Sequence, residues 1–65
     1  MQTLKEAREA KGIKQLAVAN ALNVTRQTYA KYEEKPHLMP VGKAEAACSF
    51  IGVELSDIFF GSNVK

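Results

Sequence analysis

The sequence predicts an all-α fold of five short helices, and three observations lead to this class. Apolar residues recur at helical spacing in successive segments, whereas no segment alternates apolar and polar residues as a strand does. Residues 15–34 fit two helices joined by a tight turn. The chain has 65 residues, 46% of them hydrophobic, which suits one domain near the lower size limit for folding on a hydrophobic core.

The first helix is predicted over residues 4–11. Thr3 and Glu6 have the spacing of a capping box, in which each side chain binds the backbone N–H of the other residue. Gly12 can adopt the left-handed conformation that ends a helix. The stem of Arg8 is expected to pack beside the buried stripe while its guanidinium finds a partner. That stripe consists of the two spaced apolar residues, Leu4 and Ala7.

The second helix is predicted over residues 15–22. Its inward face consists of three small or branched apolar residues, Val18, Ala19 and Leu22. Leu16 lies off that face, so we expect it to be partly exposed. Asn23 follows, and asparagine is among the few non-glycine residues that tolerate the left-handed backbone needed to redirect the chain. Val24 is then expected to fill the corner between the two helices.

A third helix is predicted over residues 26–34, and it ends before Pro36. Thr25 precedes this helix, and its hydroxyl can accept a hydrogen bond from an N–H of the first turn. One side of the helix carries long polar side chains, those of Arg26, Gln27 and Lys31. The opposite side carries two tyrosines, whose hydroxyl groups need partners at the edge of the core: Tyr29 and Tyr32.

The carboxy-terminal half contains a loop and two further predicted helices. The loop, residues 35–40, holds two prolines and two sizeable apolar residues, Leu38 and Met39. A fourth helix is expected from Pro40 or Val41 to Gly52. Its inward stripe consists of Ala44, Ala47, Cys48 and Ile51. A fifth, from about Leu55 to Phe60, is expected to complete the core with Leu55, Ile58 and Phe59. Residues 1–61 form one domain in this prediction, and residues 62–65 form a frayed tail.

Positive charge is concentrated in the amino-terminal half of the chain. The net charge at pH 7 is +2, but residues 1–35 hold seven Lys or Arg residues against four Glu, a net of +3. Residues 36–65 hold two Lys against three acidic residues, a net of −1. A positive amino-terminal half suits a surface that faces phosphate groups, although an ordinary solvated surface can carry the same charges.

The remaining composition limits the compartment and the chemistry. Without a long apolar run or a signal segment, the chain is expected to be cytoplasmic. Cys48 is the single cysteine, and on an inward stripe it is expected to act as a small buried hydrophobe. His37 has no second ligand at metal-binding spacing. No catalytic triad, carboxylate pair or glycine-rich phosphate loop is present, so we expect no enzyme activity, metal or cofactor.

Motif residues in register along most of the chain resemble the Cro/repressor (XRE-type) helix-turn-helix family of phages and bacteria. These residues are Arg8, Gly12, Ile13, Gln15, Val18, Ala19, Leu22, Asn23, Val24, Thr25, Arg26, Tyr29 and Glu33. Gly52-Val53, followed by Leu55-Ser56-Asp57-Ile58-Phe59, resembles the family's carboxy-terminal close. The resemblance implies a lambda-repressor-like DNA-binding domain with a central helix-turn-helix. Lys14 departs from the pattern, because it stands where the family usually has a Ser or Thr cap.

The resemblance also implies which residues read DNA bases. Arg26 and Gln27 match positions that reach base edges, and Lys31 matches a third such position one turn later. Arginine can donate two hydrogen bonds to guanine, and glutamine can pair in the same way with adenine. Lys31 suits either a base or a phosphate. Arg8 and Glu33 match a pair that forms a partly buried ion pair between the first and third helices.

A second group of residues is expected to contact the DNA backbone. Gln15 is similar to a family glutamine that bonds a phosphate and braces the first side chain of the recognition helix. Thr28 matches a position that touches the backbone or a thymine methyl group. Lys14 and Lys35 are further candidates for phosphate contacts, and helix N-termini also donate backbone N–H groups to phosphates.

The function that this resemblance implies is a sequence-specific regulator of transcription, of the small phage Cro kind, that binds double-stranded DNA in the host cytoplasm. We expect a homodimer on a pseudo-palindromic operator, with recognition helices about 34 Å apart. A weak dimer would form mainly on DNA. The Leu38-Met39 loop and the Phe59-Phe60 end are the candidate interface. No membrane and no small-molecule ligand is expected.

Two alternatives remain open from the sequence. An antitoxin or a restriction–modification controller would have the same motif and the same DNA-binding residues. A protein-binding adaptor, such as an antirepressor, belongs to a different class and should carry apolar residues in place of Arg26, Gln27 and Lys31. Binding to random duplex as salt rises distinguishes an adaptor from a DNA-binding protein.

Overall fold

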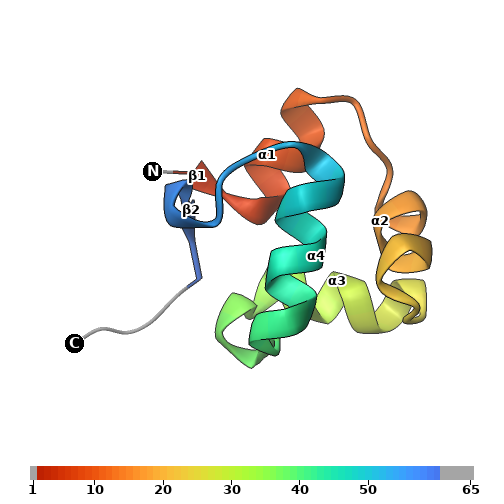
Figure 1. Cartoon of the computed structure of the whole chain (residues 1–65). Helices are drawn as coiled ribbons and strands as arrows, with labels where there is room; N and C mark the ends of the chain where they lie inside the picture. The colour runs from red at the N-terminus through yellow and green to blue at the C-terminus, as the bar shows by residue number, and fades with distance from the viewer. Residues whose placement is uncertain (1, 61–65) are drawn as a thin grey trace.

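Within residues 2–60, four α-helices pack around one core, with two 3₁₀ turns and a two-stranded parallel sheet beside them (Figure 1). A computed structural model describes residues 2–60 of the chain. In chain order the elements are β1 (Gln2–Thr3), α1 (Leu4–Ala10), α2 (Gln15–Leu22), α3 (Arg26–Glu34), η1 (Pro36–Leu38), α4 (Val41–Ile51), η2 (Leu55–Asp57) and β2 (Ile58–Phe59). Helix α4 contacts both α1 and α2, and α2 contacts α3. The predicted tail, residues 62–65, lies outside the described residues.

The predicted capping box at the start of α1 is confirmed. The Glu6 N–H donates to Thr3 Oγ1 at 3.1 Å, and the Thr3 N–H donates to Glu6 Oε1 at 2.8 Å. Helix α1 ends at Ala10, one residue earlier than predicted, and Gly12 has the expected left-handed backbone, with φ of 71°. The bounds predicted for α2 and α3 agree with the structure. Helix α4 begins at Val41, as predicted, but ends at Ile51, one residue earlier than predicted, with Gly52 as its left-handed cap.

The core consists of the inward residues of the four helices, together with Met39 from the segment after η1 and Ile58 from β2. The buried apolar residues are Leu4, Ala7, Val18, Ala19, Leu22, Tyr29, Met39, Ala44, Ala47, Cys48, Ile51 and Ile58. Small residues on the facing sides of α2 and α4 let these helices approach closely. Leu16 is 54% exposed, as its place off the inward face predicts. No helix within residues 2–60 is long and apolar enough to cross a membrane.

The predicted fifth helix is wrong, and so is the expectation of a chain without strands. Residues 55–57 form a single 3₁₀ turn, and Ile58–Phe59 then runs as a strand parallel to β1, with Gln2 opposite Ile58. Because successive strand residues point to opposite faces, Ile58 is buried while Phe59 is 48% exposed. Leu55 is exposed as well. Of the three residues expected to complete the core here, only Ile58 does so.

The segment between α3 and α4 separates its two apolar residues. Pro36–Leu38 forms the 3₁₀ turn η1, whose last residue, Leu38, is 54% exposed. Met39 follows in an extended conformation and is buried in the core. The expectation that both residues form an exposed interface is therefore wrong for Met39, because its side chain is used for packing within the chain.

Candidate nucleic-acid interface

The turn between α2 and α3 is fixed by backbone hydrogen bonds that end α2. Asn23 has φ of 61° and ψ of 42°, which is the predicted left-handed conformation. The Asn23 N–H donates to the Asn20 carbonyl at 3.1 Å, and the Val24 N–H donates to the Ala19 carbonyl at 3.0 Å. Val24 packs against the core, as expected for a residue in the corner. These contacts set the direction in which α3 leaves the turn.

Helix α3 begins at a threonine cap. The Thr28 N–H donates to Thr25 Oγ1 at 3.1 Å, and the Thr25 hydroxyl donates to Thr28 Oγ1 at 3.0 Å. By contrast, Lys14 at the start of α2 makes no side-chain cap to the residues that the structure describes. This agrees with its departure from the family pattern.

Two lysines stabilise helix ends, and sequence reasoning gave neither of them a partner. Lys43 of α4 donates its ammonium to the Leu22 carbonyl at 2.8 Å, directly before the turn. Lys11 donates to the Ile51 carbonyl at 3.2 Å, at the end of α4. Cations near the last carbonyls of a helix are favourable, because those carbonyls have no partner within the helix. No sequence signal finds these contacts, since each joins residues from separate elements.

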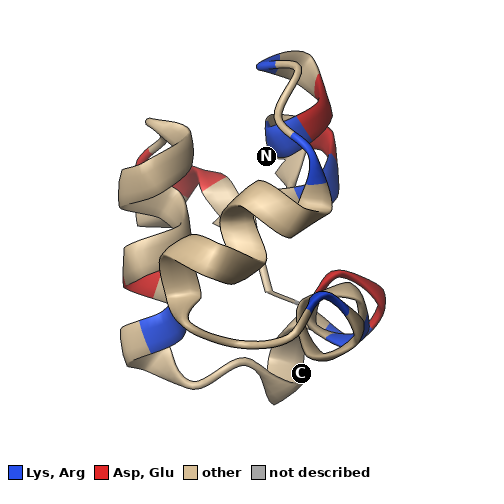
Figure 2. Cartoon of the chain, turned by 90° about the vertical axis from the view of Figure 1, so that its right-hand side faces the viewer, with Lys and Arg blue, Asp and Glu red and all other residues tan. Residues whose placement is uncertain are grey.

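The solvent-facing side of α3 carries the three residues predicted to read bases. Arg26, Gln27 and Lys31 are all exposed, whereas Tyr29 on the opposite side is fully buried. In Figure 2, α2 crosses the middle of the view without a charged residue, and the Lys and Arg positions lie on the surrounding elements. Helix α3 is therefore anchored by its tyrosine and leaves its long polar side chains open to a ligand.

The four residues predicted to contact the DNA backbone lie around this exposed face. Gln15 is the first residue of α2 and Lys14 precedes it, Thr28 lies on the first turn of α3, and Lys35 directly follows α3. Lys14 and Lys35 are exposed, and Gln15 and Thr28 are half-buried. The structure thus places Gln15 in contact with Arg26 at the start of α3, and Lys35 directly after the end of α3. Their contacts with DNA stay a prediction.

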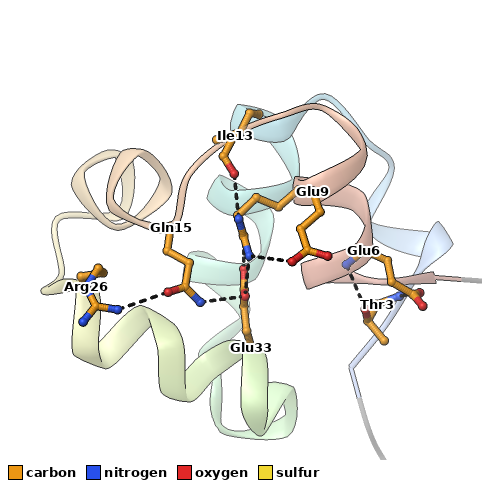
Figure 3. A network of polar contacts seen from close by, with 8 residues as sticks. Thr3, Glu6, Glu9, Ile13, Gln15, Arg26 and Glu33 are labelled. Carbon is orange, nitrogen blue, oxygen red and sulfur yellow. Dashed lines mark hydrogen bonds and ion pairs between the residues drawn. The ribbon is translucent and has the colours of Figure 1, made fainter.

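A chain of polar contacts runs from α1 to the first residue of α3 (Figure 3). Arg8 donates two hydrogen bonds to Glu33, which confirms the predicted ion pair. The Gln15 side-chain amide donates to Glu33 Oε1 at 3.0 Å. Arg26 Nη1 in turn donates to Gln15 Oε1 at 3.3 Å. Gln15 therefore contacts the first side chain of α3, as its resemblance to the family glutamine implies.

The charges of the Arg8–Glu33 pair are stable in the folded protein. The two side chains are only 9% and 3% exposed. Burial favours the neutral acid, but hydrogen bonds from Arg8 and Gln15 outweigh it and hold the pKa of Glu33 below its ordinary value. The hydrogen bond to Glu33 raises the pKa of Arg8, against the opposing effect of burial. Both groups therefore stay charged across neutral pH.

The hydroxyl of Tyr29 differs from what the sequence predicts. The Tyr29 hydroxyl is buried near Glu33 and Arg8, but makes no hydrogen bond of acceptable geometry within the described residues. Burial, together with the neighbouring carboxylate, raises the pKa of Tyr29 well above its ordinary value. The expected partner for this hydroxyl is therefore missing from residues 2–60. Tyr32 packs partly buried against the core.

Residues 2–60 contain no cluster of three or more His, Cys, Asp or Glu side chains that can hold a metal ion. His37 is exposed in η1. Cys48 is buried in α4, and burial raises the pKa of its thiol. A thiol in this state packs as a small hydrophobe, since the thiolate is the reactive form.

Comparison with known proteins identifies the motif at the sequence level. A family model described as helix-turn-helix matches residues 4–58. No curated protein and no solved structure matches the chain. The matched region begins with α1 and ends in β2, so it includes the turn, α3 and the polar contacts around Gln15. Because the match covers well over half of the chain, the protein belongs to the helix-turn-helix family of DNA-binding domains.

Proposed function

We propose that this protein is a sequence-specific transcriptional regulator that reads operator half-sites in the major groove with α3. The observation that carries this proposal is the division of α3 into two sides. Tyr29 is buried under the helix, while Arg26, Gln27 and Lys31 are exposed on its outer side. A helix that is anchored in this way can enter the major groove with its polar side chains toward the base edges.

Each exposed side chain has a base contact that fits its chemistry. Arg26 suits guanine, whose O6 and N7 accept two hydrogen bonds from one guanidinium. Gln27 suits adenine, which offers one donor and one acceptor to a side-chain amide. Lys31 lies one turn further along α3 and can donate to a base or to a phosphate. Each good bidentate pair discriminates against a wrong base by about 1–3 kcal/mol.

Phosphate contacts on both sides of α3 would fix the register of the protein on the duplex. Lys14 and Gln15 lie at the start of α2, where free backbone N–H groups also favour an anion. Thr28 and Lys35 lie on the first turn and just beyond the end of α3. Contacts of this kind position the protein without reading sequence.

We further propose that the protein binds its operator as a homodimer through a surface formed by η1, the start of α4 and η2. A hollow of about 210 Å³ lies there, lined mostly by apolar residues: Pro36, His37, Met39, Val41, Ala44, Leu55 and Phe60. Leu38 of η1 and Val41 of α4 are exposed in the same segments, and Phe59 is exposed in β2, which directly follows η2. A surface with both a hollow and protruding apolar side chains can pair with itself about a two-fold axis.

Charge on the two sides of this surface supports a second copy as its occupant. Lys35 directly precedes η1, whereas Glu54 and Asp57 precede and end η2. A two-fold axis through the hollow would bring η1 of one copy opposite η2 of the other, and so a cation opposite carboxylates. The surface also begins where α3 ends, so two recognition helices could lie on the same side of such a dimer.

The motif residues shared with the Cro/repressor family favour a small phage repressor of the Cro kind, acting on DNA in the bacterial cytoplasm. An antitoxin or a restriction–modification controller would use the same surface of α3. These regulators differ in which operator they bind, so selection of bound duplexes from a random pool is the most informative measurement. A palindromic pair of half-sites would support the dimer as well.

The salt dependence of binding to random duplex tests the proposal most directly. A protein that neutralises phosphates releases condensed counterions from the DNA when it binds. This release becomes less favourable as salt rises, so the logarithm of the affinity falls linearly with the logarithm of the salt concentration. We expect a steep slope, and tighter binding to a selected duplex than to random DNA. An adaptor protein would show little binding at any salt, and this result would overturn the proposed function.

The dimer surface is tested by two leucines of equal exposure. Leu38 and Leu16 are each 54% exposed, but only Leu38 lies in η1, between two residues that line the hollow, His37 and Met39. Leu38→Ser is expected to weaken self-association, measured by sedimentation of the free protein and of the operator complex. Leu16→Ser is the matched control and should leave association unchanged. Equal effects of the two substitutions would place the interface elsewhere.

A further inference from the structure

We infer that Glu33 determines which base Arg26 can read, by fixing the orientation of the Gln15 side-chain amide between them. This inference rests on the proposed function of α3 in reading DNA. Glu33 lies two helical turns after Arg26, and its side chain is 3% exposed, so it is a positioning residue rather than a base contact. Gln15 lies between them and contacts both (Figure 3).

The orientation of a glutamine amide is decided by its partners, because its oxygen and nitrogen ends have nearly the same shape. A carboxylate accepts hydrogen bonds and donates none. Glu33 Oε1, at 3.0 Å, can therefore face only the NH₂ group of Gln15. This leaves the carbonyl oxygen of Gln15 directed at Arg26, where it accepts from Nη1 at 3.3 Å.

The reverse orientation of the amide would lose both contacts. The carbonyl oxygen would then face the Glu33 carboxylate, and the NH₂ group would face the Arg26 guanidinium. Each arrangement places like partial charges together. Glu33 itself is held in place by two hydrogen bonds from Arg8, so it does not turn to follow Gln15. Glu33 thus keeps the carbonyl oxygen of Gln15 directed at Arg26, where this oxygen is a fixed hydrogen-bond acceptor.

A fixed acceptor at this point restrains one N–H group of Arg26 and leaves the others for DNA. A guanidinium carries five N–H donors in a planar fork, so a bond from Nη1 to Gln15 still leaves a pair for guanine O6 and N7. The Gln15 oxygen would repel a side chain at position 26 that has only hydrogen-bond acceptors, because neither group could donate to the other. We therefore expect preference for guanine at one base pair to depend on Glu33, which itself does not reach DNA.

The test compares Glu33→Gln with Glu34→Gln in the full chain. Both substitutions remove one negative charge from neighbouring positions, but Glu34 is exposed and lies outside the contacts of Gln15. Arg26→Ala first identifies the base pair that Arg26 reads, by selection from a random duplex pool. We expect Glu33→Gln to lower the preference for guanine at that pair about fivefold or more, and Glu34→Gln to leave it within about twofold.

A second pair of measurements keeps the inference testable if Glu33→Gln unfolds the chain. The double variant Arg8→Met with Glu33→Gln removes both charges and keeps an apolar stem at position 8. It should show the same loss of preference as the single variant. In the free protein, the side-chain amide resonances of Gln15 should move in either Glu33 variant and stay in place in Glu34→Gln.

The outcomes separate this inference from the proposed function. If the wild-type protein binds no duplex, the function itself fails. If the wild type selects guanine and a folded Glu33 variant selects it equally, only the role of Glu33 is overturned. Unchanged Gln15 amide resonances in the Glu33 variants would overturn it as well. A uniform loss on all sequences would indicate a phosphate effect and would also contradict the inference.

Discussion

Arg8 and Glu33 are 25 positions apart in the chain, yet the Arg8 guanidinium donates to both carboxylate oxygens of Glu33, at 2.5 and 3.1 Å. A third donor of Arg8 binds the Ile13 carbonyl at 2.7 Å. One buried side chain thus joins α1, the segment before α2 and the end of α3. Removal of either partner leaves an uncompensated charge in a site with almost no access to water.

Arg8→Met and Glu33→Gln are each expected to lower the free energy of unfolding by about 3–5 kcal/mol, because breaking a buried pair strands the other charge. The double variant should cost less than the two single losses added together. Urea denaturation at pH 7, arranged as a double-mutant cycle, measures this coupling.

The matched control for this cycle is Glu9→Gln. Glu9 contacts the same arginine at 3.8 Å, but its side chain is 57% exposed. An exposed pair contributes at most about 1 kcal/mol, so this substitution should change stability little. Additive losses at Arg8 and Glu33, or an equal loss at Glu9, would contradict the structural role of the buried pair.

The residues that sequence reasoning placed well are those whose partners are near in sequence or fixed by the motif. The capping box of α1, the left-handed turn at Asn23 and the threonine cap of α3 each depend on a few neighbouring residues. The end of α2 and the start of α3 follow from this turn and this cap, whereas the start of α2, which has no side-chain cap, follows from helical spacing. The pair of Arg8 and Glu33 is distant in sequence, but the family pattern implies it.

The features that sequence reasoning missed all depend on contacts between distant elements. Ile58 and Phe59 form a strand only because β1 lies beside them, so local helical spacing is misleading there. Lys43 and Lys11 reach carbonyls of other helices, and nothing in their own neighbourhood indicates this. Met39 is buried and Leu38 is exposed, because one 3₁₀ turn decides which of two adjacent apolar residues faces the core.

Stability at acid pH is expected to depend on Glu33. Its pKa in the folded state lies below the ordinary value of 4.5, so the folded state holds this proton less readily than the unfolded chain. The resulting stabilisation is present above about pH 4.5 and is lost as pH falls through the lower, folded-state pKa. Thermal unfolding between pH 6 and pH 2 should show this loss in the wild type and in Glu34→Gln. The double variant at Arg8 and Glu33 should lack that component, and an unchanged acid profile in it would refute the assignment.

Tyr29→Phe is expected to change stability at pH 7 by less than about 1 kcal/mol, since the buried hydroxyl makes no hydrogen bond of acceptable geometry within residues 2–60. At alkaline pH the variant should be the more stable protein. The pKa of Tyr29 is raised in the folded state, so the neutral tyrosine contributes its full stabilisation below the ordinary pKa of 10.0. This contribution to the free energy of unfolding decreases as pH rises above that value. Denaturation curves at pH 7 and pH 11 measure both effects. A loss of several kcal/mol at pH 7 would show that the hydroxyl has a strong partner.

Because Asn23 has a left-handed backbone conformation, we expect two substitutions at this position to have opposite effects on stability. Asn23→Ala should destabilise the protein by about 1–2 kcal/mol, because a Cβ without a polar side chain is disfavoured at φ of 61°. Asn23→Gly should be neutral or stabilising. Asn20→Ala is the control, since Asn20 is exposed within α2 and alanine favours the helix there. Equal losses for the two substitutions at position 23 would mean that the Asn side chain itself stabilises the turn.

Gln27 and Lys35 are expected to affect DNA binding in different ways, although both are exposed near α3. Gln27→Ala should relax base preference at one position in each half-site, because it removes a side chain that discriminates adenine by about 1–3 kcal/mol. Lys35→Ala should weaken binding to all sequences about alike and lower the salt slope by about 1, since it removes one phosphate contact. Affinities for selected and random duplexes at several salt concentrations separate these effects. Gln27 does not read a base if its substitution weakens both duplexes equally, and Lys35 does not bind a phosphate if the slope stays the same.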